Sequence, residues 1–185
     1  ATGTGKSKAA IDAIKTLVGF RASARILIVV PTAKLRDKTW KNEFIEWGAK
    51  DIWDNSVDKI CYASLSNIQG CYYDLVIMDE VHNLTERSSD FFQYNEIKTC
   101  MALTATPPEN QLKQMLLDKY NLPMIYEITL DEAVDLGVVA PYEITVIQTE
   151  LDAVRTNVLA GSKVKQFYVT EASNYAYYAK IETSE

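Results

Sequence analysis

The chain has 185 residues, of which 48% are hydrophobic and 24% charged, and this composition predicts a globular protein with one domain plus an extension. No apolar run is long enough to cross a bilayer and the N-terminus is polar, so we expect no membrane partner and a cytoplasmic or other intracellular location. One histidine and three cysteines without CxxC spacing argue against a zinc site and a disulfide framework.

Charge is distributed unevenly along the chain, whose net charge is −6. Residues 1–50 carry ten Lys and Arg against four Asp and Glu, whereas residues 51–185 carry nine against 21. Such asymmetry is compatible with a basic, nucleic-acid-binding face on an acidic body. Solvated surface charge explains the same numbers equally well, so charge alone does not decide the function.

The chain opens with a glycine-rich segment that ends in a Gly-Lys-Ser triplet. This triplet matches the end of the phosphate-binding pattern G-x-x-x-x-G-K-[ST], and the candidate residues are Gly3, Thr4, Gly5, Lys6 and Ser7. Lys6 would reach the β and γ phosphates and the Ser7 hydroxyl would bind Mg²⁺. A helix is predicted directly afterwards from Ala10, Ile14, Leu17 and Val18. A flexible glycine-rich terminus before a helix remains the alternative.

A continuous apolar run at residues 26–30 predicts a buried strand, and Pro31 and Thr32 follow it. The next helix should carry Trp40, Phe44 and Trp47 on one face and end at Gly48. We interpret these three aromatic side chains as core packing rather than as a base-stacking surface. A further strand is predicted at residues 59–63.

The run at residues 75–78 predicts a second buried strand, which delivers two carboxylates at its end. Asp79 can hold Mg²⁺, and Glu80 can orient and deprotonate an attacking water. A solvated acidic turn is the alternative, and it weakens because a phosphate loop lies in the same chain. His82, taken alone, is more often a packed or exposed histidine than a functional one.

A third buried strand is predicted at residues 100–103, followed by Thr104-Ala105-Thr106-Pro107. Taken alone, this segment is typical of a strand-ending turn. A helix follows, marked by Leu112, Met115, Leu116 and Tyr120, and further strands are plausible at residues 124–128 and 142–149. Residues 137–141 indicate a boundary, and the pattern weakens into polar helix or linker beyond about residue 151.

Apolar strands that alternate with helices predict an α/β fold, a mainly parallel sheet with helices on both faces. The carboxyl ends of parallel strands meet at one sheet edge. We therefore expect Ser7, Asp79, Glu80 and Thr104 to converge there.

The order of these motifs resembles the superfamily 2 DExH-type helicases and translocases, specifically their first RecA-like lobe in Snf2-like, phage or restriction-type members. The resemblance covers roughly residues 1–145, and a viral or phage origin fits it. It is carried by ILIVVPTAKLRDKTWKNEFIEWG, CYASL, YDLVIMDEVHNL and LTATPPENQLKQML, all after GKS. The later LGVVAPYEITVI resembles the exit from that lobe.

The resemblance implies an ATP-binding helicase lobe at residues 1–150, and a linker or the start of a second lobe at residues 151–185. It implies ATP and Mg²⁺ as cofactors, with Lys6 and Ser7 binding ATP·Mg²⁺, Asp79 binding the metal and Glu80 as the catalytic base. His82, Thr104 and Thr106 would couple the nucleotide to a second lobe. Pro31, Thr32, Lys34 and Arg36 would contact a nucleic acid backbone, DNA more than RNA.

Parts of the family pattern are missing, because the chain starts without the strand that should precede the phosphate loop and lacks a second RecA-like lobe with its arginine finger. We therefore expect a fragment that is catalytically idle alone and able to self-associate. Two alternatives stay open: a nucleotide- or DNA-binding remnant that never turns over, and another P-loop enzyme such as a small-molecule kinase. The Thr-Ala-Thr segment and Pro31-Thr32 disfavour the kinase.

Overall fold

The computed structural model describes the whole chain except residues 1–2, 107–110, 144, 146–154, 163–164 and 171–185. The chain divides into two compact units, residues 1–141 and 142–185, and each is described by itself.

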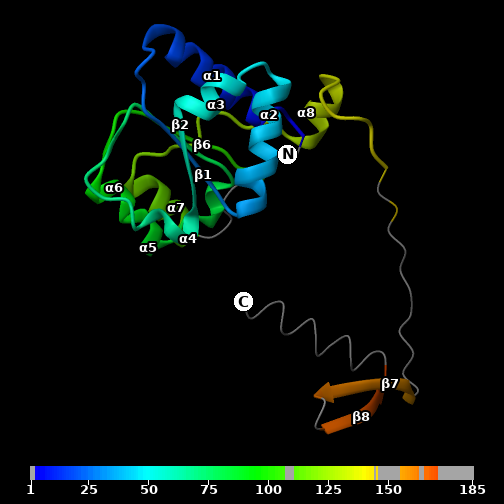
Figure 1. The fold of residues 1–185 in the computed structure, drawn as a ribbon. Helices are drawn as coiled ribbons and strands as arrows, with labels where there is room; N and C mark the ends of the chain where they lie inside the picture. The colour runs from blue at the N-terminus through cyan, green and yellow to red at the C-terminus, as the bar shows by residue number, and fades with distance from the viewer. Residues whose placement is uncertain (1–2, 107–110, 144, 146–154, 163–164, 171–185) are drawn as a thin grey trace. The chain divides into compact units, whose positions relative to one another are not determined.

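The first unit is built on a sheet of four parallel strands (Figure 1), which has the order β2-β1-β4-β6. The strands are β1 (Ile26–Val30), β2 (Val57–Cys61), β4 (Leu75–Met78) and β6 (Cys100–Ala102). Ile26 pairs with Val57 on one side and with Leu75 on the other, and Val76 pairs with Cys100. The three apolar runs are therefore neighbouring parallel strands, and the predicted α/β fold class is confirmed.

Helices cover both faces of this sheet, as Figure 1 shows. One face packs against α1 (Lys6–Phe20), α2 (Trp40–Glu46) and α3 (Lys50–Asn55) through a core that includes Ile28. The other packs against α4 (Tyr62–Leu65), α6 (Phe91–Tyr94) and α7 (Gln111–Lys119) through a core that includes Leu27 and Val29. Every residue of β1 is buried because its side chains alternate between two covered faces.

Shorter elements complete this unit. A π-turn, η1 (Leu35–Thr39), leads into α2, and a 3₁₀ turn, η2 (Val81–Asn83), follows β4 closely. The remaining elements are α5 (Glu86–Ser89), α8 (Leu130–Asp135) and the parallel pair β3 (Tyr72–Tyr73) and β5 (Glu96–Ile97). None of the described helices has the length and apolar composition that a membrane span requires.

Three expected elements differ from the structure. The strand expected at residues 59–63 lies two residues earlier, as β2. The strand expected at residues 124–128 is wrong, because these residues pair with no neighbour in the described sheets and Ile125 is 91% exposed. Local β-propensity does not make a strand without a partner. Of the strand expected at residues 142–149, residues 142, 143 and 145 are not in a strand and the others lie outside the described residues.

The second unit contains an antiparallel hairpin of β7 (Arg155–Ser162) and β8 (Lys165–Thr170). Polar helix or linker was expected from about residue 151, and for these two ranges that expectation is wrong. The pairing register shifts between Arg155 and Val158, and such a shift breaks the alternation by which a strand is recognised in a sequence. The predicted boundary at about residue 150 stays a prediction.

Candidate nucleotide and magnesium site

The glycine-rich loop adopts a backbone that only glycine takes easily. Gly3 and Gly5 have φ angles of 77° and 78°, in the left-handed region. Gly5 is the N-cap of α1, and its carbonyl accepts a hydrogen bond from the Ala9 amide at 3.0 Å. Lys6 and Ser7 therefore begin a 15-residue helix, whose N-terminal amides and dipole favour a bound anion.

Asp79 follows β4 directly and is held from several sides. Its amide donates to the Val29 carbonyl at 2.9 Å. Its Oδ2 accepts a hydrogen bond from Trp40 Nε1 at 2.8 Å, and its carbonyl accepts one from the Tyr62 hydroxyl at 3.0 Å. Burial raises the pKa of Tyr62, so this hydroxyl stays protonated and remains a donor.

Lys6, at the start of α1, is one of the charged groups that act on the Asp79 carboxyl. Burial raises the pKa of the Asp79 carboxyl above its ordinary value, and the Glu80 charge adds to this, whereas the Trp40 hydrogen bond and the positive charge of Lys6 lower it. An effect of Lys6 on Asp79 requires proximity, because charge interactions decay over several ångströms. Lys6 is therefore near enough for its charge to act on the Asp79 carboxylate, although 73 positions separate the two residues in the chain.

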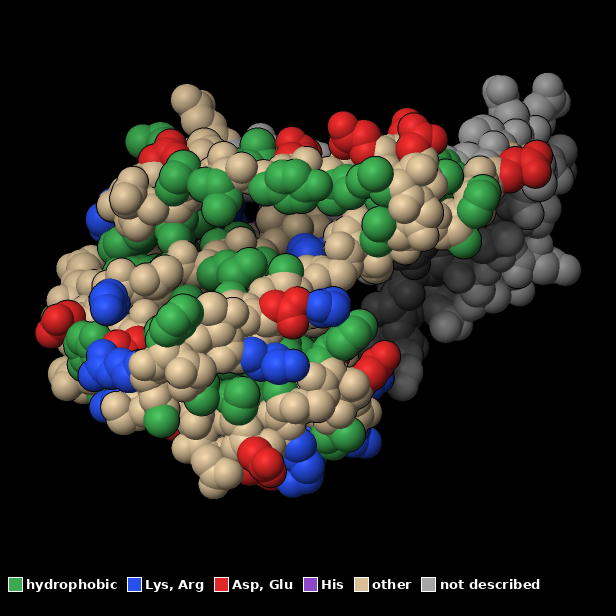
Figure 2. All heavy atoms as spheres, turned by 90° about the horizontal axis from the view of Figure 1, so that it is seen from above, with side chains coloured by type: hydrophobic (Ala, Val, Ile, Leu, Met, Phe, Trp, Pro, Cys, Tyr) green, Lys and Arg blue, Asp and Glu red, His purple; other side chains and the backbone are tan. Residues whose placement is uncertain are grey.

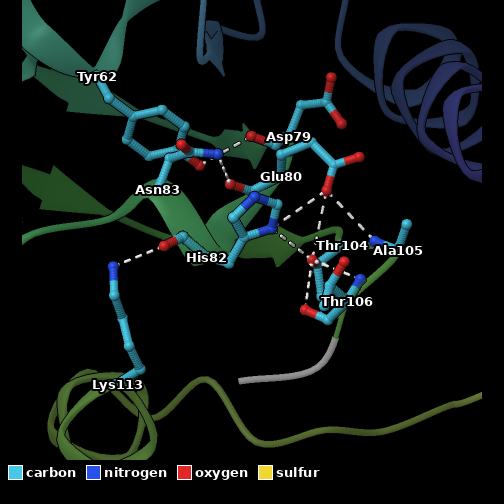
Figure 3. Close-up of polar contacts among 9 residues, drawn as sticks. All are labelled: Tyr62, Asp79, Glu80, His82, Asn83, Thr104, Ala105, Thr106 and Lys113. Carbon is cyan, nitrogen blue, oxygen red and sulfur yellow. Dashed lines mark hydrogen bonds and ion pairs between the residues drawn. The ribbon is translucent and has the colours of Figure 1, made fainter. Parts of the chain in front are cut away.

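Glu80 has a backbone conformation that is unusual for its residue type, with φ 51° and ψ 58°. This left-handed geometry costs about 1–3 kcal/mol in a non-glycine residue and persists only where the surroundings hold it. The amide and side chain of Asn83 both donate to the Glu80 carbonyl, at 2.9 and 3.0 Å. The bend turns the Glu80 side chain toward the loop after β6 (Figure 3).

The loop after β6 receives the Glu80 carboxylate. Glu80 Oε2 accepts hydrogen bonds from the Thr104 hydroxyl and the Ala105 amide, both at 3.3 Å. His82 Nδ1 lies 2.9 Å from Thr104 Oγ1 and 3.3 Å from the same carboxylate oxygen. Thr106 joins through its main chain, because its amide donates to Thr104 Oγ1 at 3.1 Å. The structure thus gathers four of the predicted site residues into one network (Figure 3).

The predicted nucleic-acid residues lie at the carboxyl end of β1. Thr32 Oγ1 accepts a hydrogen bond from the Leu35 amide at 3.3 Å, which starts the helical segment that contains η1. Lys34 is exposed, but Arg36 binds the neighbouring Asp37 with two hydrogen bonds of 2.7 and 3.0 Å. On the face that Figure 2 shows, Lys and Arg side chains are interspersed with acidic and apolar ones. Pro31 is partly buried at the start of this segment.

The sequence predicted Trp40, Phe44 and Trp47 on one buried face, which is correct for Trp40 and Phe44 and wrong for Trp47. Trp40 is 2% exposed and packs beside Phe44, as expected, but it also donates to Asp79. Trp47, expected on the same buried face, is 36% exposed and donates to Glu43 at 3.2 Å. Helix α2 ends at Glu46, so Trp47 no longer follows the helical periodicity. Residue spacing carries no signal for the Trp40–Asp79 bond.

Two other contacts were not predicted. Lys113, from α7, donates to the main-chain carbonyl of His82 at 2.6 Å (Figure 3) and to that of Leu84, also at 2.6 Å. Tyr62 belongs to the CYASL segment and reaches the Asp79 carbonyl. Neither residue type is diagnostic in a sequence, because lysine and tyrosine are most often surface and packing residues.

The donor set fits ATP with Mg²⁺. Carboxylate and hydroxyl oxygens, which Asp79 and Ser7 supply, are the ligands that Mg²⁺ prefers. Within the described residues no group of three or more His, Cys, Asp or Glu side chains could enclose a metal. Mg²⁺ is usually bound by one or two carboxylates and by substrate phosphates. Lys6 and the start of α1 supply the positive counterpart for those phosphates.

The fold is a parallel sheet with a glycine-rich loop at the start of one helix, and acidic and threonine residues follow two neighbouring strands. Together these features define a helicase- or translocase-type ATPase domain of superfamily 2. Residues 1–109 match the family model described as type III restriction enzyme, res subunit. The match spans more than half of the chain, and the chain belongs to this family. The resemblance to the first lobe of superfamily 2 DExH-type proteins is confirmed.

Two relatives are similar over most of the chain. The type I restriction enzyme EcoAI endonuclease subunit of Escherichia coli is 26% identical over an alignment of 174 positions, which covers 82% of this chain and 21% of the relative. The chain therefore spans about a fifth of the length of that protein. The Sulfolobus solfataricus SWI2/SNF2 ATPase core, solved in complex with dsDNA, is 19% identical, with a TM-score of 0.47 over 61% of this chain and 28% of that one.

Proposed function

We propose that the chain is the ATP-binding lobe of an ATP-dependent DNA helicase or double-strand translocase, in which ATP hydrolysis drives movement on DNA. The observation that carries this proposal is the network of Glu80, His82 and Thr104 beside Asp79 and Lys6. It joins a carboxylate suited to activating water to the loop of a neighbouring strand. A simple nucleotide-binding domain has no need of such a linkage.

Each residue of the site has a distinct task in this proposal. Lys6 and the first amides of α1 bind the phosphates, and Ser7 and Asp79 hold Mg²⁺, which would neutralise the charge of the β and γ phosphates. Glu80 Oε2 is engaged by Thr104 and Ala105, whereas Oε1 has no hydrogen bond to another described residue. Oε1 is therefore the oxygen placed to accept a proton from the attacking water.

Coupling to movement would pass through the loop after β6. Thr104 contacts His82, the Glu80 carboxylate and the main chain of Thr106, so a displacement of this loop by a second lobe would reorient Glu80. That lobe would also supply the arginine finger, an element worth about 10³–10⁵ in turnover in related P-loop enzymes. The low coverage of the EcoAI relative leaves room for such a lobe in a longer protein.

DNA is the proposed partner. The matched family and the curated relative are both restriction enzymes by description, a class of enzyme that acts on DNA. Pro31, Thr32, Lys34 and Arg36 would meet the phosphate backbone, where a helix start and nearby cations favour binding without base specificity. Lys34 would contribute most, because Asp37 already neutralises Arg36.

The test is ATP hydrolysis by the full-length gene product that contains this chain, with and without double-stranded DNA. We expect DNA-stimulated turnover that Glu80→Gln lowers by about 10²–10⁴ while ATP binding persists. Glu86→Gln, an exposed glutamate on α5, is the matched control and should act as wild type. ATP binding without turnover in the unmodified protein would instead support the non-hydrolysing alternative.

A further inference from the structure

Asp79 is held by an aromatic donor from each of the two helical layers. Trp40 belongs to α2, on one face of the sheet, and its indole N–H binds the side chain at Oδ2. Tyr62 belongs to α4, on the other face, and binds the main-chain carbonyl. At the end of β4, Trp40 therefore binds one oxygen of the carboxylate, and this hydrogen bond also fixes the direction of the other oxygen, Oδ1.

The Trp40 indole is a rigid donor with no freedom to follow a rotating carboxylate. It is 2% exposed and packs on Phe44, and an indole nitrogen can only donate. A rotation of Asp79 that broke the bond would leave a buried N–H unsatisfied, a loss that proteins rarely tolerate. The ring therefore favours a single orientation of the carboxylate.

The backbone before Trp40 is shaped to place this ring. The π-turn η1 closes on Trp40, whose amide donates to the Leu35 carbonyl five residues earlier. One extra residue in a turn advances the following side chains by about 100° relative to an uninterrupted α-helix. π-turns are rare and frequently mark functional sites. The same turn contains Arg36, one of the predicted nucleic-acid residues.

We propose that Trp40 is a positioning residue, which orients the Asp79 carboxylate so that Oδ1 binds Mg²⁺ and links that carboxylate to the π-turn at residues 35–39. This rests on the proposed role of Asp79 as the metal ligand. Outer-sphere partners of this kind change metal affinity by about 10–100-fold when they are removed.

The chain offers an internal control. Trp47, seven residues later, also donates its indole N–H to a carboxylate, that of Glu43, at 3.2 Å. That pair lies at the other end of α2 and is partly exposed, and neither residue has a described hydrogen bond to Asp79. Loss of the Trp47 donor should therefore leave the metal site unchanged.

The experiment measures Mn²⁺ binding by electron paramagnetic resonance, with a non-hydrolysable ATP analogue and the full-length gene product. Asp79→Asn defines the portion of binding that belongs to this site. Trp40→Phe and the isosteric analogue benzothienylalanine at position 40 both remove the N–H, and the second also preserves the ring shape. Trp47→Phe is the control. Affinity for the analogue without metal and thermal unfolding are recorded for each protein.

We expect both Trp40 replacements to weaken site-specific Mn²⁺ binding about 10-fold or more, with unchanged affinity for the metal-free analogue and with Trp47→Phe at the wild-type level. Wild-type Mn²⁺ affinity in the benzothienylalanine protein would reduce Trp40 to a packing residue and overturn the proposal, while the proposed function stands. Unchanged Mn²⁺ binding in Asp79→Asn would instead remove the metal role of Asp79, and both proposals would fall.

Discussion

Thr104 and Thr106 were predicted to play the same coupling role, but the structure distinguishes them. The Thr104 hydroxyl contacts Glu80 Oε2, His82 Nδ1 and the Thr106 main chain. Among the described residues, Thr106 takes part through its amide and carbonyl, and it is exposed. Replacement of each threonine by valine keeps the shape and removes only the hydroxyl, so Thr104→Val should disturb the network and Thr106→Val should not.

The size of the effect follows from the hydrogen bonds. A neutral hydrogen bond contributes a net ~0.5–1.5 kcal/mol, and one to a charged group somewhat more. Thr104 is half-buried, and the Ala105 amide still binds Glu80 in the variant. We therefore expect Thr104→Val to lower the free energy of unfolding by about 1–2 kcal/mol, and Thr106→Val to stay within about 0.5 kcal/mol of wild type.

Thermal unfolding and steady-state ATP hydrolysis of the full-length gene product measure the two consequences. The loss in stability corresponds to a fall in Tm of about 3–6 °C for a unit of this size. Turnover should fall about 10–100-fold with little change in ATP affinity, because a misplaced catalytic group loses rate rather than binding. Equal effects of the two valine variants, in either assay, would refute the assignment of the network to the Thr104 side chain.

Three further predictions concern single side chains. Asp74→Asn should destabilise the first unit at neutral pH and match wild type in acid, because the Arg25 amide and the Arg21 side chain lower the pKa of Asp74. The stability that the Asp74 charge contributes is present above the ordinary carboxyl pKa range and is lost as pH falls through the lowered pKa. Denaturant titration at a series of pH values would measure this loss. Lys113→Met should lower Tm and turnover together, because it leaves two main-chain carbonyls after β4 without their donor, and equal Tm in both proteins would contradict this. Lys34→Ala should reduce the magnitude of the slope of log K for DNA against log salt by about 0.9 for each phosphate that the side chain neutralises. This reduction should be larger than the one that Arg36→Ala causes, and equal slopes in the two variants would mean that Asp37 does not neutralise Arg36.

The sheet could be predicted from the sequence because its strands are continuous apolar runs. Residues 26–30 and 75–78 are buried on both faces, and no amphipathic helix has such a pattern. The convergence of Asp79, Glu80 and Thr104 followed from the parallel direction alone, since neighbouring parallel strands end at one edge. For these residues, it was enough to know which predicted strand each one follows.

The interactions that were missed depend on information that a sequence pattern does not contain. The Trp40–Asp79 bond requires the π-turn, which changes the helical phase that spacing arguments assume. The left-handed backbone of Glu80 is held by Asn83 and by packing, not by a glycine that could be recognised. The absent strand at residues 124–128 shows the opposite error, because pairing is a non-local property.

Asp79 and Glu80 are adjacent in the chain but anchored to different parts of the fold. Asp79 is bound by the helical layers through Trp40 and Tyr62, whereas Glu80 is bound by the loop after β6 through Thr104. Glu80 lies in the left-handed region and so does not continue the extended backbone of β4, which lets its side chain turn toward the loop after β6. A displacement of the loop after β6 would therefore act on Glu80 first and leave the orientation of Asp79 to its own partners. In the proposed motor this would let hydrolysis be switched while the metal stays bound.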